Sequence, residues 1–319
     1  MAIACVDWRQ ADETDLAALY AAEIRRWSGS LGWDTAASWD QIELGRRLGT
    51  VSGLLAVDAD GAIAGWTFFL LHGDILQIGG FVSASDATTA ALVGGILSSA
   101  IAARAQAVML FAFTDAPGLT DALMRHGLAV THYDYLSKTL GPEPACLCGD
   151  VRPWCEGDAA AVAALLATAY PGADPARPFA PQGTIAEWRE YVGQIVTAAG
   201  CGTIMPGACF VVPRGSDRLA GAVLVTTLAA TTAHIAQIAV DPQAQGQGFG
   251  RLLVSAACAS ASAAGCDRMT LLVDGRNRVA QQLYEASGFV EAARFVSAGS
   301  RQPVRLTSVA AAGAAVVRL

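Results

Sequence analysis

The chain has 319 residues, which is enough for two domains that each bury a core of their own. Hydrophobic residues make up 53% of the sequence and its mean hydropathy is +0.40, values that exclude a disordered chain. A formal net charge of −7 and a pI near 5.1 argue against a broad basic surface, so we expect no nucleic-acid partner.

The N-terminal segment and the cysteines predict a cytoplasmic protein. The segment MAIACVDWRQADE has neither a basic start nor an apolar core, so it does not resemble a secretion signal. Residues 86–104 are the most apolar stretch, but they are shorter than a membrane span; we expect a buried helix there and no membrane partner. The eight cysteines suit free thiols. Cys146, Cys148 and Cys155 lack the further ligands of a zinc site, so we expect no metal.

The first half of the chain opens with a capped apolar segment, VDWRQADETDLAALY, and continues with strands. Apolar and β-branched runs predict strands at 54–60, 62–71 and 75–82, and a long helix follows them. A strand at 108–113 and a helix at 119–126 come next, and the helix ends at Gly127.

The segment GPEPACLCGD, residues 141–150, interrupts this pattern with two prolines and two glycines. We therefore predict a first domain at 1–142, a linker at 143–150 and a second domain at 151–319. The expected elements of the second domain are helices at 158–170 and 184–199, strands at 208–212, 219–229 and 234–240, a helix ending at Gly265, a strand at 269–273, a helix at 278–287, and strands at 289–298 and 303–309. The first half shares this order, so we interpret the chain as two diverged copies of one domain.

Residues 240–253, VDPQAQGQGFGRLL, place three glycines at alternate positions between a strand and a helix. Gly246, Gly248 and Gly250 leave the backbone bare, which suggests that a ligand lies against it. The first amides of a helix have no partner within the helix and carry partial positive charge, so this turn predicts an anion site. A cofactor diphosphate is the natural occupant, and Arg251 would add positive charge at the rim.

A dinucleotide cofactor is one alternative for this loop. In the Rossmann fold the first glycine follows the strand directly and the spacing is GxGxxG. Here the five residues DPQAQ intervene, the spacing is GxGxG, and only one β-α-β crossover is expected. Asp274, at the end of the next strand, is the one feature that favours NAD.

The segment resembles instead the acetyl-CoA signature of the GNAT (Gcn5-related N-acetyltransferase) superfamily, Gln/Arg-x-x-Gly-x-Gly/Ala, which Gln245, Gly248 and Gly250 match. HIAQIAVDP is similar to the family's fourth strand, and NRVAQQLYEASGF, residues 277–289, to its Asn-x6-Tyr-x3-Gly-Phe segment. The resemblance covers residues 151–310. It is much weaker over residues 1–140, where SASDATTAALVGG lacks the spaced glycines, so the first domain resembles a degenerate GNAT copy.

The resemblance implies an α/β fold of two tandem GNAT-like domains, each with a central mixed, mostly antiparallel sheet flanked by helices. It also implies that acetyl-CoA is the cosubstrate and that its acetyl group is transferred to a primary amine. The residues that it places at the cofactor are Ile238, Ala239, Val240, Gln245, Gly246, Gln247, Gly248, Phe249, Gly250, Arg251, Asn277 and Tyr284. Tyr284 takes the position of the phenol that protonates the departing CoA thiolate, although packing between helix and sheet also explains an aromatic residue there.

The base that deprotonates the amine is less well indicated. His234 falls where some family members carry a carboxylate on the fourth strand, and an imidazole there can accept a proton directly or through water. A structural histidine, or a carboxylate of Glu187 or Glu190, is the alternative. The family's substrate wall corresponds here to residues 170–191, which contain Tyr170, Phe179, Glu187, Trp188, Glu190 and Tyr191.

We therefore expect an N-acetyltransferase that acts on a primary amine of a small-molecule acceptor by direct attack. The alternative from another class is a non-catalytic acyl-CoA-binding module. No motif encodes the identity of the acceptor or the oligomeric state.

Overall fold

The computed structural model describes residues 3–142, 151–197, 201–215 and 217–300. The elements of the first half are β1 Ala4–Asp7, α1 Glu13–Leu31, α2 Ala36–Leu48, β2 Ser52–Val57, β3 Ile63–His72, β4 Ile75–Ser83, α3 Asp86–Leu97, β5 Ala107–Phe113, α4 Leu119–Arg125 and β6 Ala129–Thr139. Those of the second half are β7 Arg152–Pro153, α5 Ala159–Ala169, α6 Ile185–Val196, β8 Thr203–Ile204, β9 Phe210–Arg214, β10 Arg218–Ala229, β11 Thr232–Val240, α7 Phe249–Ala263, β12 Arg268–Asp274, α8 Arg278–Ala286 and β13 Val290–Gly299.

Both halves follow one order of elements: a strand, two helices, three strands, a helix, a strand, a helix and a final strand. The second half adds only the two-residue β8. In both halves the last helix ends before a glycine with positive φ, Gly127 at 79° and Gly288 at 85°. The tandem fold predicted from the sequence is thus confirmed. The predicted linker 143–150 and the predicted strand 303–309 lie outside the described residues, and the boundary between the halves stays a prediction.

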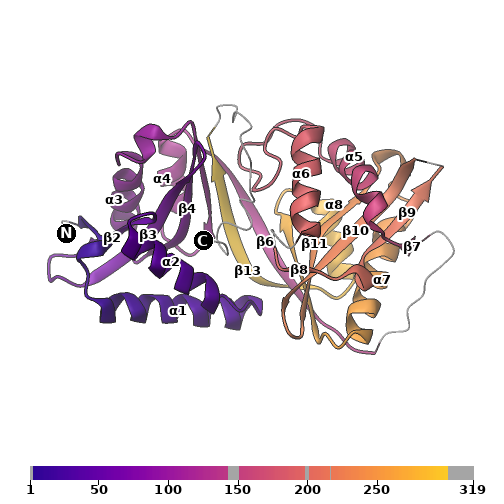
Figure 1. The fold of residues 1–319 in the computed structure, drawn as a ribbon, viewed down its shortest axis with the longest axis horizontal. Coiled ribbons are helices and arrows are strands. Elements are labelled where there is room, and N and C mark those ends of the chain that lie inside the picture. The colour runs from indigo at the N-terminus through magenta and orange to yellow at the C-terminus, as the bar shows by residue number, and fades with distance from the viewer. Residues whose placement is uncertain (1–2, 143–150, 198–200, 216, 301–319) are drawn as a thin grey trace.

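The two halves share a single sheet because they exchange their last strands. Among the described residues the sheet has thirteen strands, in the order β1-β2-β3-β4-β5-β13-β6-β12-β11-β10-β9-β7, with β8 paired to β10. β13 therefore lies between β5 and β6, and β6 lies between β13 and β12, side by side at the centre of the molecule (Figure 1). The pairs are antiparallel except β4 with β5 and β11 with β12.

Local sequence explains where several helices begin. Asp12 precedes α1, and its carboxylate accepts a hydrogen bond from the Thr14 amide at 2.7 Å. Thr184 and Glu187 form a reciprocal capping box at the start of α6. These caps satisfy amides that have no partner within the helix, so both helix starts are fixed by the chain itself.

An aromatic cluster fills the junction between the halves. It consists of Trp27, Leu31, Trp33, Phe113, Tyr133, Tyr135 and Phe295, with Cys201 and Leu228 packed against it. The end of α1 comes so close to the second half that a Cβ on Gly32 would lie 2.9 Å from Oγ1 of Thr232. The first half is therefore packed tightly against β11 and β12, the strands that carry the predicted site.

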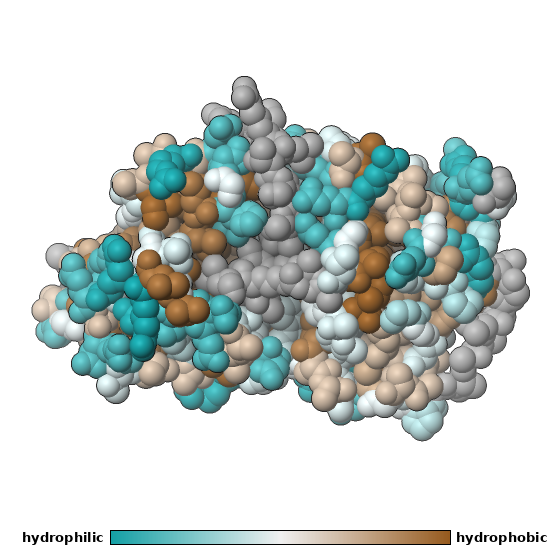
Figure 2. All heavy atoms as spheres, in the orientation of Figure 1, coloured by the Kyte–Doolittle hydropathy of each residue, from teal (hydrophilic) through white to brown (hydrophobic). Residues whose placement is uncertain are grey.

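Most apolar side chains are inside the molecule. On the face drawn in Figure 2, brown spheres occur in separate patches between teal ones. No helix within the described ranges is both long and apolar enough to cross a membrane. The described residues also contain no group of three or more His, Cys, Asp or Glu side chains that could hold a metal ion; Cys146 and Cys148 lie outside those residues.

Candidate active site

The two strands at the centre of the second half separate part of the way along their length. β11 pairs with β12 only over Thr232–Ile235, opposite Arg268–Leu271. The register between β10 and β11 shifts at the same point, which leaves Ala236 as a bulge. β11 continues to Val240, paired with β10, and β12 continues to Asp274, paired with β6, but the two strands do not pair with each other beyond Ile235 and Leu271. The backbone of β11 after Ile235 therefore has an open edge.

Two phenols contact this edge. The hydroxyl of Tyr170, at the end of α5, donates a hydrogen bond to the Ile238 carbonyl at 3.0 Å. The hydroxyl of Tyr191, on α6, donates to the Ala236 carbonyl at 3.2 Å. Burial raises the pKa of both phenols, that of Tyr170 to about 12, so both remain protonated donors near neutral pH.

The phenol contacts also define which amides face the opening. In an extended strand the N–H and C=O of one residue point to the same side, and successive residues alternate. The Ile238 amide therefore faces the open edge, and so does that of Val240, two residues on. Ala239 turns its backbone toward β10, in line with Asp241, whose amide donates to the Ala220 carbonyl at 2.8 Å. Two of the three predicted amide donors thus face the opening.

The glycine loop leads from this strand into α7. Gly246 and Gly248 have φ values of 78° and 85°, a region that side chains disfavour. A Cβ added to either residue would meet no atom within 4 Å, so space is open above both. Gly250 differs, because its Cβ would lie 3.0 Å from Cδ2 of Leu283; its small size lets α7 pack closely on α8.

The start of α7 carries no side-chain cap. Gly248 is the N-cap residue, and the first bond within the helix runs from the Leu252 amide to the Gly248 carbonyl at 3.1 Å. The amides of residues 249–251 therefore have no partner within the helix. Gln245, Gln247 and Arg251 are exposed beside them. An uncapped helix start with open space above it fits an anionic group such as a diphosphate.

The Asn277 to Phe289 segment forms α8 and the turn that follows it. The Asn277 side chain caps the helix by accepting from the Ala280 amide at 3.1 Å. Tyr284 is 5% exposed, and its ring packs edge-on against Phe289 at 5.9 Å. Burial, and to a smaller extent the charge of the Tyr170 phenol, raise the pKa of Tyr284. Tyr284 belongs to the hydrophobic core against which Tyr170 and Ile238 pack, so it has a packing role in the second half.

His234 lies deep in the junction between the halves. Its Nδ1 is 2.9 Å from Oγ1 of Thr270, and its ring stacks on Tyr135 at 5.9 Å and meets Trp33 edge-on at 6.1 Å. Burial lowers the pKa of His234 to about 3, so the imidazole is neutral near neutral pH. A pocket that disfavours the imidazolium weighs against proton uptake by this side chain.

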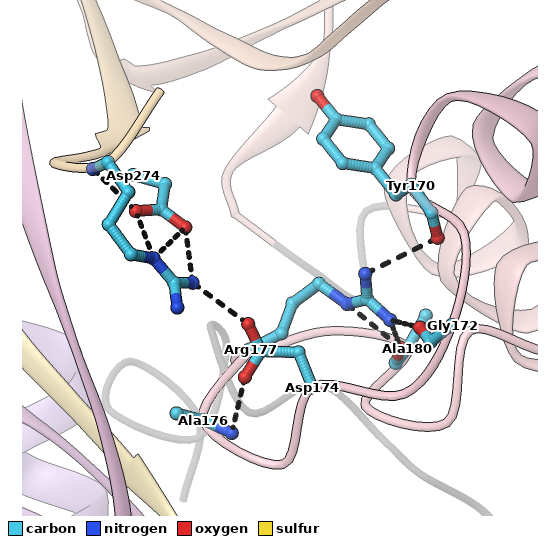
Figure 3. Close-up of polar contacts among 8 residues, drawn as sticks. Tyr170, Gly172, Asp174, Ala176, Arg177, Ala180 and Asp274 are labelled. Carbon is cyan, nitrogen blue, oxygen red and sulfur yellow. Dashed lines mark hydrogen bonds and ion pairs between the residues drawn. The ribbon is translucent and has the colours of Figure 1, made fainter. Parts of the chain in front are cut away.

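An aromatic wall covers the open edge. Phe179 stacks on Tyr191 at 4.8 Å, and the Trp188 ring lies 5.5 Å from that of Tyr170. The buried guanidinium of Arg177 donates to the carbonyls of Gly172 and Ala180 at 3.0 and 2.7 Å, as Figure 3 shows. Arg177 therefore fixes the loop between α5 and α6 by backbone hydrogen bonds.

A second contact joins this loop to the end of β12. Nη2 of Arg276 lies 3.0 Å from Asp174 and 2.6 Å from Asp274. Tyr133 of β6 lies opposite Asp274 in the strand register, and burial and the charges of the two carboxylates raise its pKa. The first half therefore contributes a strand beside the end of β12, which the sequence analysis did not find because strand exchange leaves no local signal.

The carboxylates predicted as alternative bases have other contacts. Oε2 of Glu187 accepts from the amides of Gln182 and Thr184 at 2.9 and 3.3 Å, and burial raises its pKa. Glu190 accepts from the Gln194 amide group at 3.4 Å, one turn further along α6. The role of Glu187 in the capping box explains its burial.

Comparison with known proteins adds two sequence findings. Residues 161–289 match the family model described as the acetyltransferase (GNAT) family. A stretch of 64 residues is 47% identical to a mycothiol acetyltransferase of Beutenbergia cavernae; it covers 20% of this chain and only 22% of that protein.

Solved structures show the likeness of the whole fold. A GCN5-related N-acetyltransferase from Sphaerobacter thermophilus aligns with a TM-score of 0.65 at 20% identity, over 95% of this chain and 98% of that one. A tandem GNAT protein from the clavulanic acid biosynthesis pathway aligns with a TM-score of 0.50 at 13% identity, over 95% and 100% of the two chains. Residues 161–289 therefore match the GNAT acetyltransferase family, and the chain as a whole has the fold of a tandem GNAT protein.

Proposed function

We propose that the second half binds acetyl-CoA and transfers its acetyl group to a primary amine of a small molecule. The observation that carries this proposal is the continuity of two features, the open edge of β11 and the uncapped start of α7. A long ligand fits these two features, with its diphosphate at the start of α7 and its amide groups along the open edge of β11. The match of residues 161–289 to the acetyltransferase (GNAT) family supports the same cosubstrate.

The glycine loop would hold the diphosphate. The amides of residues 249–251 would donate to its oxygens, and the absent side chains of Gly246 and Gly248 leave room for them. Gln245, Gln247 and Arg251 would surround the group at the exposed rim, and Asn277 would border it from α8. The Val240 and Ile238 amides would bind the pantetheine and the thioester carbonyl, with Ala239 between them.

Two groups would assist the chemistry beside the open edge. The Ile238 amide would stabilise negative charge as it develops on the thioester oxygen. Tyr284 would donate its proton to the departing thiolate. Burial raises its pKa, so the phenol is protonated before the thiolate leaves. His234, predicted as the base, is neutral and buried, and we propose for it a structural role between the halves. The ammonium of the acceptor would lose its proton to solvent water before the free amine attacks, and the proton that the nitrogen loses on collapse of the intermediate would also pass to solvent, which in turn restores the Tyr284 phenol.

The acceptor would enter beside the aromatic wall, on the side where Asp174 and Asp274 lie. The name of the Beutenbergia relative, a mycothiol acetyltransferase, supports a small-molecule acceptor. Asp174 and Asp274 would give the entrance some negative charge, which suits an amine that arrives protonated, although Arg276 balances part of it.

Calorimetry with acetyl-CoA and a thiol-release assay over a panel of primary amines test the proposal together. We expect one acetyl-CoA per chain and free CoA release with at least one amine. Tyr284→Phe keeps the ring but removes the proton donor, so affinity for acetyl-CoA should hold while turnover falls.

Two outcomes would count against this function. Binding of acetyl-CoA without thiol release across the panel would favour the non-catalytic acyl-CoA-binding module. Unchanged turnover in Tyr284→Phe would return this residue to a packing role and assign the proton to another donor or to water.

A further inference from the structure

The carbonyls on the open edge of β11 have unusual partners. In a continuous parallel sheet, the carbonyls of Ala236 and Ile238 would accept hydrogen bonds from the amides of β12. Pairing with β12 ends at Leu271, so those amides are not available. The phenols of Tyr191 and Tyr170 take their place at 3.2 and 3.0 Å. Two side chains thus replace a strand as the hydrogen-bonding partner of this edge.

The two anchored carbonyls lie on either side of one amide. The Ile238 N–H belongs to the peptide unit between residues 237 and 238. The unit before it is held through the Ala236 carbonyl, and the unit after it through the Ile238 carbonyl. With both flanking peptide planes anchored, the direction of the Ile238 N–H is fixed from both sides.

The phenols are themselves held in place. The Tyr191 ring stacks on Phe179 at 4.8 Å with an angle of 16° between the planes, and the Tyr170 ring packs beside Trp188 at 5.5 Å. Arg177 lies over Trp188 at 5.3 Å and donates to the carbonyl of Gly172, two residues beyond Tyr170. These contacts restrict both rings, so the hydroxyl positions are set before any ligand binds.

The first half provides an independent comparison. β4 also pairs with β5 only over its first residues, Ile75–Ile78, and the register shift leaves Gly80 as a bulge. There Phe68 covers the strand so closely that a Cβ on Gly80 would lie 2.7 Å from its ring. The described residues show no phenol bonded to a β4 carbonyl; Tyr20, on α1, donates to Glu43 instead. The phenol pair occurs in the half that carries the glycine loop.

We infer that Tyr170 and Tyr191 are positioning residues that aim the Ile238 amide at the thioester carbonyl of bound acetyl-CoA. This inference rests on the proposed function. Neither phenol takes part in bond formation. Each acts through the backbone of β11, so their loss should weaken polarisation of the thioester more than it weakens binding of the cofactor.

Isotope-edited infrared spectroscopy of acetyl-CoA labelled with ¹³C at the acetyl carbonyl tests this without an identified acceptor. Bound to the wild-type protein, the label should absorb at a lower frequency than in water, because the Ile238 amide polarises the carbonyl. In Tyr170→Phe the ring remains but the anchor is lost, and most of the downshift should disappear. Tyr191→Phe should lose part of it.

Kinetics with any amine that supports turnover should agree. We expect kcat of Tyr170→Phe to fall about tenfold, in line with the loss of one hydrogen bond, while KM for acetyl-CoA stays within about twofold. Tyr20→Phe is the matched control. It also removes one phenol hydroxyl that donates a hydrogen bond, but Tyr20 lies on α1, the first helix of the other half, and its partner is Glu43. That variant should keep both the wild-type frequency and the wild-type rate.

The outcomes separate the inference from the function on which it rests. If the wild-type protein does not bind acetyl-CoA, the proposed function fails and the inference falls with it. If the wild type binds and both tyrosine variants keep the full downshift and rate, only the inference is overturned. Tighter binding of acetyl-CoA by Tyr170→Phe would also overturn it, because the phenol would then compete with the ligand.

Discussion

The starts of α3 and α7 occupy equivalent places in the two halves, yet they are satisfied in different ways. At α3 the Ser85 side chain accepts from the Thr88 amide at 3.2 Å, and Asp86 places a carboxylate in the first turn. At α7 the N-cap is Gly248, which has no side chain, and the first turn contains no acid. At α3 the chain's own side chains satisfy the free amide and offset the positive charge of the helix start, so an external anion would gain little by binding there.

The strand edges beside these helices differ in the same way: the edge in the first half is covered, and the edge in the second half is open. In the first half, Phe68 and Trp39 cover the bulge of β4, at 2.7 and 3.3 Å from a Cβ placed on Gly80. In the second half, the two tyrosines satisfy carbonyls and leave an amide free. The comparison shows that the two halves share the strand order and the bulge, while they differ in the residues at the proposed ligand site. The first half therefore supports the fold and the second half carries the proposed chemistry.

Separating the two halves should have the largest effect, because neither half should then fold cooperatively. β6 lies between β12 and β13, so a fragment of residues 151–319 lacks an interior strand of its own sheet. We expect fragments 1–142 and 151–319 to show no cooperative thermal transition alone, and to regain one when mixed. Circular dichroism on heating measures this. Cooperative unfolding of either fragment by itself would show that the halves are independent.

The Gly248→Val variant tests the helix start itself. A β-branched side chain at a φ of 85° strains the loop and enters the space above it, so acetyl-CoA affinity should fall by about tenfold or more. Gly265→Val is the matched control: Gly265 also has positive φ and open space around its Cβ, but it lies at the other end of α7. Calorimetry should show near wild-type affinity for the control and a comparable loss of thermal stability in both. Equal affinities would remove the loop from the site.

The pH dependence of stability tests the structural role of His234. Its folded pKa of about 3 lies below the unfolded value of about 6.5, so between these values the unfolded chain binds a proton that the folded chain does not. Stability should therefore fall as pH decreases through this window, by about 1.4 kcal/mol per pH unit for one proton. Urea titrations should show a shallower dependence in His234→Gln. An acid limb in the wild-type activity profile that vanishes in this variant would instead support a role as base.

The Ser85→Ala variant should have the smallest effect. Loss of an N-cap side chain costs about 1 kcal/mol, so the free energy of unfolding should fall by that amount. Acetyl-CoA affinity should not change, because the proposed ligand site lies at α7 and not at α3. A gain of acetyl-CoA binding at a second site would show that only the cap keeps the first half from binding.

Local patterns were enough to predict most elements of the second half and their order. The glycine spacing, the capping residues and the Asn277 to Phe289 segment each depend on residues close together in the chain, and the predicted order of described elements is confirmed. The exchange of β6 and β13 could not be predicted in this way. β6 contains polar residues such as His132 and Asp134, and β13 begins with exposed residues, so neither pattern marks a central strand; the strands that flank them come partly from the other half.

The candidate site was predictable to a similar extent. The bare backbone of the glycine loop follows from residue type, whereas the surroundings of His234 do not, because Trp33 and Tyr135 reach it from the first half. Tyr170 and Tyr191 were expected only as part of a substrate wall. Their contacts with β11 depend on the bulge at Ala236, which no local pattern marks.

Amide hydrogen exchange with and without acetyl-CoA compares the two helix starts in one experiment. We expect slower exchange on addition of acetyl-CoA at residues 249–251 of α7 and at Ile238 and Val240 of β11, with no change at the start of α3. Protection at residues 86–88 of α3, or at neither helix start, would contradict this expectation.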